Sequence, residues 1–157
     1  MANTFTQLQI HVVFSVQNRT PSLKKTWRNR LFEYMTGIIQ NHGHKLLQIG
    51  GVEDHVHILI GMQPTEALSE LIMEVKRDSC KWINGQKFVK GHFYWQEGYG
   101  AFSVSSAAVS RVCGYIAHQE EHHKGITYEE EKEMMVQRST FQIDNQERTA
   151  PSESQEN

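Results

Sequence analysis

The amino-acid sequence predicts an α+β protein with a ferredoxin-like (RRM-like) antiparallel sheet, helices packed on that sheet, and further C-terminal helices. The first observation is size, because 157 residues with 38% hydrophobic side chains can form one domain with a core. The second is the order of the expected elements: strand, helix, strand, strand, helix, strand. The third is that every apolar run is far shorter than the roughly 20 residues that cross a bilayer. We therefore expect no membrane segment.

The first half of the chain has the clearest periodic patterns. Phe5–Val16 is rich in β-branched and aromatic residues and is expected to be a strand. In Leu23–His42 the apolar residues recur at spacings of three and four, which predicts an amphipathic helix. Lys45–Ile49 and the strongly apolar His55–Met62 are expected to form a hairpin, with the glycine pair at 50–51 as its turn.

The second half of the chain has shorter patterns. Thr65 is expected to cap a helix over Glu66–Ile83. The later elements are expected in this order: strands at Phe93–Gln96 and Ala101–Val104, a helix from Ser105 or Ser106 to about His122, and a helix at Tyr128–Arg138 capped by Thr127. We assign residues 1–138 to one domain and residues 139–157 to a polar acidic tail that we expect to be disordered.

The formal net charge of −2 argues at first against a nucleic-acid partner, but the charges are unevenly distributed. Residues 127–157 carry 8 acidic and 3 basic side chains, whereas the preceding residues carry 10 acidic and 13 basic ones. The body of the chain is therefore mildly basic, which permits phosphate binding without proving it. The two cysteines make no disulfide framework and the N-terminus lacks a signal-peptide pattern, so we expect a cytoplasmic protein.

One candidate site is the pair of histidines that begins the strand expected at 55–62. Residues i and i+2 of a strand point to the same face, so His55 and His57 project side by side and Val56 points to the opposite face. Two adjacent imidazoles can chelate one divalent metal ion. A solvated face of a sheet explains an isolated His-x-His equally well, so this pair alone predicts little.

A second candidate site lies on the helix expected to end near His122. Tyr115 and Gln119 are four positions apart, which places them on one face of a helix, with His118 beside them. A tyrosine next to an amide that can bind a metal suggests a nucleophile and the group that activates its target. The alternative is a half-buried tyrosine on an amphipathic helix with a polar end.

Together these motifs resemble the single-tyrosine HUH transposases, the TnpA family of the insertion-sequence 200/605 group (transposase IS200-like). The resemblance covers roughly residues 5–125 and includes HVVFSVQNR at 11–19, GVEDHVHILIG at 51–61 and YIAHQEEHH at 115–123. It implies that Tyr115 is the catalytic nucleophile. It also implies that His55, His57 and Gln119 bind a divalent metal, Mg²⁺ or Mn²⁺.

The same resemblance implies a reaction and partners. The protein is expected to be a metal-dependent DNA strand transferase, or single-strand endonuclease, that acts at insertion-sequence ends. It would cleave and rejoin single-stranded DNA through a 5′-phosphotyrosine intermediate, and the DNA would carry hairpins near those ends. The protein is further expected to be a homodimer in which the tyrosine helix is supplied in trans.

Basic side chains form a candidate DNA surface. Arg19 and three residues of one expected helix, Lys76, Arg77 and Lys81, are predicted to contact phosphates. Lys24, Lys25 and Arg28, beside the first loop, could do the same. Ordinary solvated helix faces explain each of these residues when it is taken singly.

Three other functions fit parts of the pattern. A domesticated HUH relative that binds or nicks hairpin DNA would share every motif. A zinc hydrolase could use His55, His57 and a C-terminal histidine, but it gives Tyr115 no clear role. A non-catalytic RNA-binding module on the same sheet leaves the histidine pair unexplained, and the strands lack the aromatic pattern of such modules.

Overall fold

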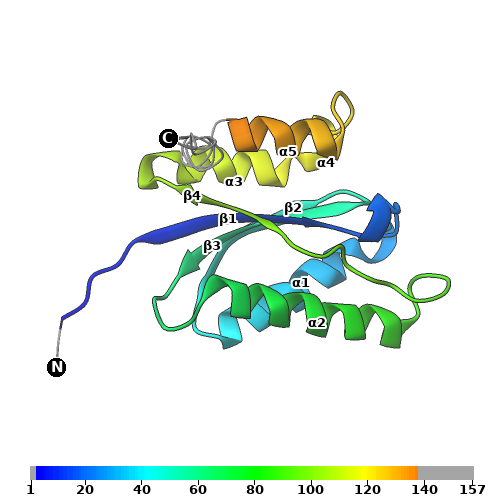
Figure 1. The fold of residues 1–157 in the computed structure, drawn as a ribbon, viewed down its shortest axis with the longest axis horizontal. Helices are drawn as coiled ribbons and strands as arrows, with labels where there is room; N and C mark the ends of the chain where they lie inside the picture. Colours follow the sequence, from blue (N-terminus) through cyan, green and yellow to red (C-terminus); the bar gives the residue numbers. More distant parts are fainter. Residues whose placement is uncertain (1–2, 138–157) are drawn as a thin grey trace, which may run out of the picture. The chain divides into compact units, whose positions relative to one another are not determined.

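The structure, a computed structural model, describes residues 3–137 (Figure 1). The chain divides into two units, Met1–Lys124 and Gly125–Asn157. The elements of the first unit, in chain order, are β1 (Leu8–Ser15), η1 (Gln17–Arg19), α1 (Lys25–Asn41), β2 (Lys45–Gly51), β3 (His55–Met62), α2 (Leu68–Gln86), β4 (Gly100–Val104), η2 (Ser106–Ala108), α3 (Val109–Ala117) and α4 (Gln119–His122). No helix in the described part of the chain is long and apolar enough to cross a membrane.

The four strands form one antiparallel sheet in the order β2-β3-β1-β4. The two long strands, β1 and β3, are central, and they pair in a register that sets Val13 opposite His57 and Ser15 opposite His55. This order and direction confirm the predicted ferredoxin-like α+β fold. Strand β3 has the bounds expected from the sequence, because its continuous apolar run is typical of a strand that is buried on both faces.

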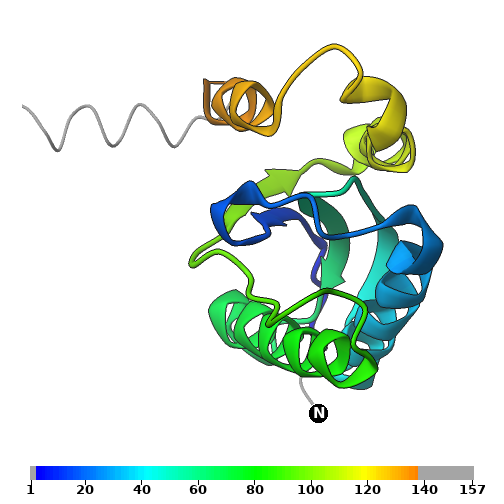
Figure 2. The same ribbon diagram turned by 90° about the vertical axis from the view of Figure 1, so that its right-hand side faces the viewer.

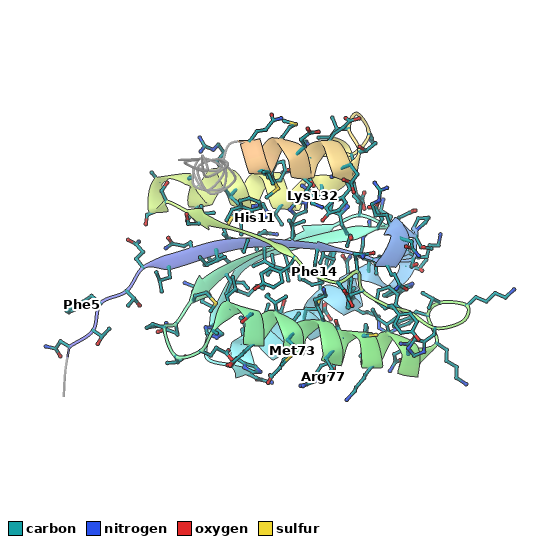
Figure 3. The ribbon with its side chains drawn as sticks, viewed as in Figure 1. Phe5, His11, Phe14, Met73, Arg77 and Lys132 are labelled. Carbon is teal, nitrogen blue, oxygen red and sulfur yellow. The ribbon has the colours of Figure 1, made fainter. Side chains whose placement is uncertain are left out.

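Both faces of the sheet are covered by helices. Helices α1 and α2 lie side by side on one face, where side chains such as Phe14, Ile58 and Leu31 form the core (Figure 2). Helix α3 packs on the other face, mainly against β2. Figure 3 shows the alternation along β1, with His11 on the side of α3 and Phe14 on the side of α2. The expectation that helices cover the sheet is confirmed, and the second covered face is where the histidines point.

Several element bounds differ from those expected. The glycine pair at 50–51 belongs to β2, and the hairpin turn lies at 52–54, where the Val52 amide bonds to the His55 carbonyl at 3.1 Å. Thr65 is not the cap of α2, because that helix begins after Ala67, which makes no side-chain cap. The strand expected at Phe93–Gln96 is reduced to a single bridge between Val16 and Trp95. Cap and turn residues were chosen from local pattern, whereas the pairing partners that set these bounds lie far away in sequence.

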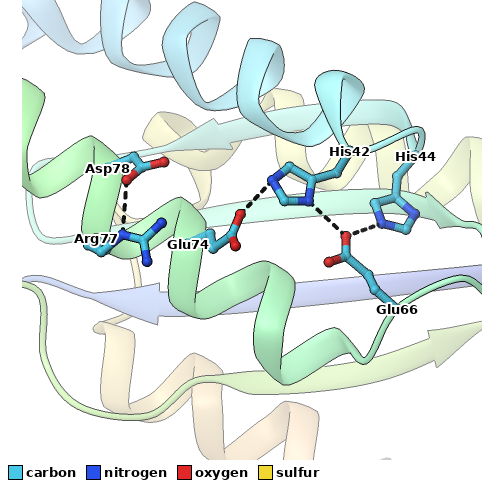
Figure 4. A network of polar contacts seen from close by, with 6 residues as sticks. All are labelled: His42, His44, Glu66, Glu74, Arg77 and Asp78. Carbon is cyan, nitrogen blue, oxygen red and sulfur yellow. Dashed lines mark hydrogen bonds and ion pairs between the residues drawn. The ribbon is translucent and has the colours of Figure 1, made fainter.

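A polar network ties the C-terminal end of α1 to α2 (Figure 4). His42 contacts Glu66 at 3.1 Å through Nδ1 and Glu74 at 2.6 Å through Nε2. His44 is buried; its Nε2 lies 2.6 Å from Glu66, and its Nδ1 accepts the amide proton of Gln63. The hydrogen bond from His44 is the main reason that the pKa of Glu66 lies below its usual value, and the contact with His42 lowers it further. Because Nδ1 of His44 accepts the hydrogen bond from the Gln63 amide, Nε2 of His44 carries the proton and donates a hydrogen bond to Glu66.

The described part of the second unit is one helix, α5 (Tyr128–Gln137). Thr127 caps it as predicted, since its hydroxyl accepts the amide proton of Glu130 at 3.3 Å. The expected end at Arg138 and the tail expected at 139–157 lie outside the described residues.

Candidate active site

The histidine pair lies at the start of β3, on the face of the sheet that α3 covers. His55 and His57 are both fully buried, and their ring centroids are 5.1 Å apart, while Val56 between them packs in the core. The predicted side-by-side arrangement is thus present. It follows from the two-residue repeat of a strand, because a single register fixes both imidazoles on one face.

Each imidazole of the pair is oriented by a second polar side chain. Nδ1 of His55 lies 2.7 Å from a carboxylate oxygen of Asp54, and Nδ1 of His57 lies 2.8 Å from Nε2 of His11. An ion bound by either residue would then use Nε2, as in the carboxylate–histidine–metal arrangements of known metal sites. Burial would raise the pKa of Asp54, but the hydrogen bond and charge of His55 outweigh it and lower that pKa.

Tyr115 lies beside the histidine pair within the same chain. Its ring centroid is 5.7 Å from that of His57 and 6.3 Å from that of His11, and its hydroxyl is 3.3 Å from Nε2 of His122. Glycine makes this approach possible, because a Cβ at Gly50 would collide with the carbonyl oxygen of Ile116, the residue after Tyr115. The backbone of β2 therefore lets α3 lie directly on the sheet.

The helix that carries Tyr115 ends before Gln119, which differs from the single continuous helix expected. Helix α3 stops at Ala117, and His118 interrupts it with a non-helical φ of −107°. The Gly114 carbonyl accepts hydrogen bonds from both the side chain of His118, at 2.7 Å, and its backbone amide, at 3.2 Å. Gln119 nevertheless reaches the site: it is buried, and its amide oxygen is 3.4 Å from Nε2 of His55.

A third histidine joins the predicted ligands. Within residues 3–124, one ring nitrogen from each of His55, His57 and His123 lies within 4.8 Å of the other two. Two ligands of one ion, each at about 2.1 Å from it, are roughly 3.0–3.4 Å apart, which fits the distance from Gln119 to His55. These three imidazoles and one amide are therefore candidate ligands of one divalent ion, and the set is richer in nitrogen than the sequence indicated.

Sequence reasoning missed His11, Asp54 and His123. His11 sits in a strand pattern that has no metal motif, and its nearness to His57 follows only from the pairing of β1 with β3. Asp54 directly precedes the pair and could have been proposed as an orienting carboxylate. His123 is four positions after Gln119, so the helical spacing used for Tyr115 and Gln119 would have found it.

The predicted DNA-contacting residues are not gathered at this site. Lys76, Arg77 and Lys81 lie on α2, on the opposite face of the sheet from α3 (Figure 3). The ammonium group of Lys76 donates to the carbonyl oxygens of Gln96 and Gly98 at 2.6 and 2.8 Å, and burial lowers its pKa. Arg77 pairs with its neighbour Asp78 at 3.1 Å. Arg19 lies in η1, with a left-handed φ of 53°.

Comparisons with solved structures find proteins of the same fold. A transposase candidate from Deinococcus radiodurans R1 superimposes with a TM-score of 0.62 at 20% identity, covering 76% of this chain and 95% of its own. A REP-associated tyrosine transposase bound to a REP hairpin gives a TM-score of 0.60 at 12% identity, covering 80% of this chain and 74% of its own. At these identities the two structures show a shared fold. No curated protein sequence matches the chain.

The match to a protein family is more specific than the match to these folds. The family described as "Transposase IS200 like" matches residues 4–119, which is most of the chain. The matched range contains the histidine pair, Tyr115 and Gln119. The protein therefore belongs to the IS200-like transposase family.

Proposed function

We propose that this protein cleaves and rejoins single-stranded DNA at insertion-sequence ends, with Tyr115 as its nucleophile. The observation that carries the proposal is the position of Tyr115 beside the buried His55–His57 pair, at 5.7 Å from the ring of His57. A phenol is a weak nucleophile at neutral pH, because its pKa is about 10. A tyrosine held next to a candidate metal centre has the electrostatic help that it needs.

The proposed reaction uses the groups around Tyr115. Its phenol oxygen attacks the scissile phosphorus, the bond to the 3′ oxygen breaks, and the 5′ phosphate stays on the tyrosine. Nε2 of His122, at 3.3 Å from the phenol oxygen, can accept its proton. One phosphoester replaces another, so a 3′-hydroxyl can later attack and rejoin DNA without ATP.

The metal would be held by His55, His57 and Gln119, with His123 as an added ligand. When bound, a divalent ion supplies Lewis acidity to the phosphate oxygens. Three imidazole nitrogens favour Mn²⁺ over Mg²⁺, since Mg²⁺ prefers oxygen ligands. Mg²⁺ at cellular concentration remains the other candidate.

The experiment that tests the nucleophile is a covalent-adduct assay. The protein is incubated with labelled single-stranded DNA from its own gene flanks and with Mn²⁺ or Mg²⁺, then separated on a denaturing gel. Tyr115→Phe removes one oxygen, so we expect a folded variant that binds DNA but forms no adduct. His57→Ala is expected to abolish cleavage. An adduct that persists in Tyr115→Phe, or maps to another tyrosine, refutes the proposal.

The substrate is proposed to be unpaired DNA beside a hairpin. A splayed strand can bring its phosphate to a recessed site without the cost of opening a duplex. The REP-associated transposase of similar fold is bound to a hairpin, which supports this class of substrate. If a fully paired duplex is cut as fast as the single strand, the proposed substrate is wrong.

The predicted homodimer with an exchanged tyrosine helix remains a proposal. In the single chain described here, Tyr115 already lies at the histidine pair of its own sheet, so exchange between two subunits would rebuild the same site in trans. Mixing His57→Ala with Tyr115→Phe subunits distinguishes the two arrangements. Exchange predicts that heterodimers regain one working site, whereas sites assembled within each chain predict an inactive mixture.

One observation favours a second function, a zinc hydrolase. Three histidines that converge on one point, His55, His57 and His123, also suit Zn²⁺. A zinc hydrolase would cleave ester substrates with Zn²⁺ and would keep that activity in Tyr115→Phe. Family membership and the position of Tyr115 favour the transposase.

A further inference from the structure

Arg28 is a buried arginine that has no place in the chemistry described so far. It was expected at a DNA surface, but it is only 5% exposed, inside α1. Its guanidinium group donates to the Leu23 carbonyl at 3.0 Å through Nη1 and pairs with Glu120 through Nη2. A buried guanidinium without such partners would be strongly destabilising. Glu120 directly follows Gln119.

The same arginine is also connected to the histidine side of the site. Leu23, which accepts a hydrogen bond from Arg28, donates its own amide proton to the Glu53 carbonyl at 2.8 Å. Glu53 lies two residues before His55. Short chains of hydrogen bonds thus run from Arg28 to the turn that precedes β3 and to the start of α4, the two segments next to the candidate ligands.

The polar bridge between Arg28 and Glu120 joins α1 to α4. A cavity of about 310 Å³ lies between α1, β2 and α4, with Phe32, Gln48 and Gln119 on its wall. Apolar packing between the two helices is therefore incomplete at this place. Lys25 adds a second ion pair to Glu120 at 3.0 Å, but its side chain is 77% exposed, so that pair is worth little.

We propose that Arg28 and Glu120 are positioning residues for the metal centre, and that their ion pair holds Gln119 at its ligand distance from His55. This inference rests on the proposed function. Residues outside the ligand shell that orient ligands typically change metal affinity or activity by 10–100-fold when replaced.

The test substitutes Glu120, whose side chain is 46% exposed, rather than the buried Arg28, and the thermal unfolding of each variant shows how far the loss of the carboxylate beside Arg28 destabilises the fold. Glu120→Ala removes the bridge, Glu120→Gln keeps a neutral acceptor, and Lys25→Ala is the matched control that removes only the exposed pair. Mn²⁺ binding is measured by electron paramagnetic resonance without DNA. Amide hydrogen exchange of residues 115–123 is measured in the metal-free protein, and thermal unfolding is recorded for every variant.

We expect Glu120→Ala to bind Mn²⁺ about tenfold more weakly, with faster exchange in residues 115–123 and unchanged exchange in β3. Glu120→Gln should lose less, and Lys25→Ala should stay within about twofold of the wild type. A Glu120→Ala protein that melts earlier but keeps wild-type Mn²⁺ affinity and exchange overturns the positioning role. His57→Ala distinguishes a failure of this inference from a failure of the proposed function. If it leaves Mn²⁺ binding unchanged, the metal site of the proposed function is wrong and this inference is lost with it.

Discussion

Gly50→Ala should damage catalysis through the backbone, without altering any group that takes part in the chemistry. A Cβ at this position would lie within 3.0 Å of the Ile116 carbonyl oxygen and 3.1 Å from its carbonyl carbon. Real Cβ atoms are rarely found so close, and ordinary contact begins near 3.4 Å. Strand β2 and helix α3 must therefore separate by about 1 Å. Tyr115, the neighbour of Ile116, moves with the helix.

The size of the effect follows from that displacement. A misplacement of about 1 Å in a reacting group can lower the rate on the order of 100-fold. The strain itself should cost about 1–3 kcal/mol of folding free energy. The assay is the single-turnover rate of covalent adduct formation on single-stranded DNA, at a temperature where circular dichroism shows the variant to be folded.

Gly114→Ala is the matched control, since it adds the same methyl group to α3 itself. Among residues 3–137, apart from its chain neighbours and the backbone of its own helix, no heavy atom lies within 4 Å of a Cβ at Gly114. Alanine should stabilise the helix by up to about 1 kcal/mol and leave the adduct rate close to that of the wild type. The reasoning fails if Gly50→Ala forms the adduct within twofold of the wild-type rate, or if both variants lose activity equally.

Three further predictions concern groups around the site and the core. Asp54→Asn should weaken Mn²⁺ binding by roughly 10–100-fold in a titration, because the carboxylate orients His55; unchanged affinity would contradict that role. Glu66 has a lowered pKa in the folded protein, so it stabilises the fold above about pH 4.5, and this contribution is lost as the pH falls through the folded value. The melting temperature of Glu66→Gln should accordingly lie below that of the wild type at pH 6 and approach it in acid. Ser79→Ala leaves the buried indole N–H of Trp95 without its 2.9 Å acceptor, which should cost about 1–3 kcal/mol in urea unfolding; a loss below 0.5 kcal/mol would mean that another acceptor takes its place.

The parts of the site that depend on one strand or one turn could be predicted from the sequence. The shared face of His55 and His57 could be predicted from the two-residue repeat of a strand, because the apolar run at 55–62 identified that segment as a strand. The nearness of Tyr115 and Gln119 could be predicted from their spacing of four positions, although α3 ends between them. The break at His118 could not be predicted, because residues 115–123 contain no proline or glycine that would mark the end of a helix.

The parts that depend on tertiary packing could not be predicted in this way. Arg28 has the sequence context of a solvated cation, yet it is buried and pairs with Glu120, a residue 92 positions away. His11 lies near His57 only because β1 pairs with β3. In each case the partner is set by the register of the sheet or the packing of a helix, and a single sequence contains no local pattern for either.

Gly50 shows why the type of residue alone was misleading. A Gly-Gly pair between two strands predicts a turn, since glycine tolerates left-handed backbone angles. Here neither glycine of the pair has a positive φ. Gly50 serves the other use of glycine, which is close approach of a second backbone, and that backbone belongs to the helix of Tyr115. The absence of one side chain in β2 thus sets how near Tyr115 can come to the histidine pair.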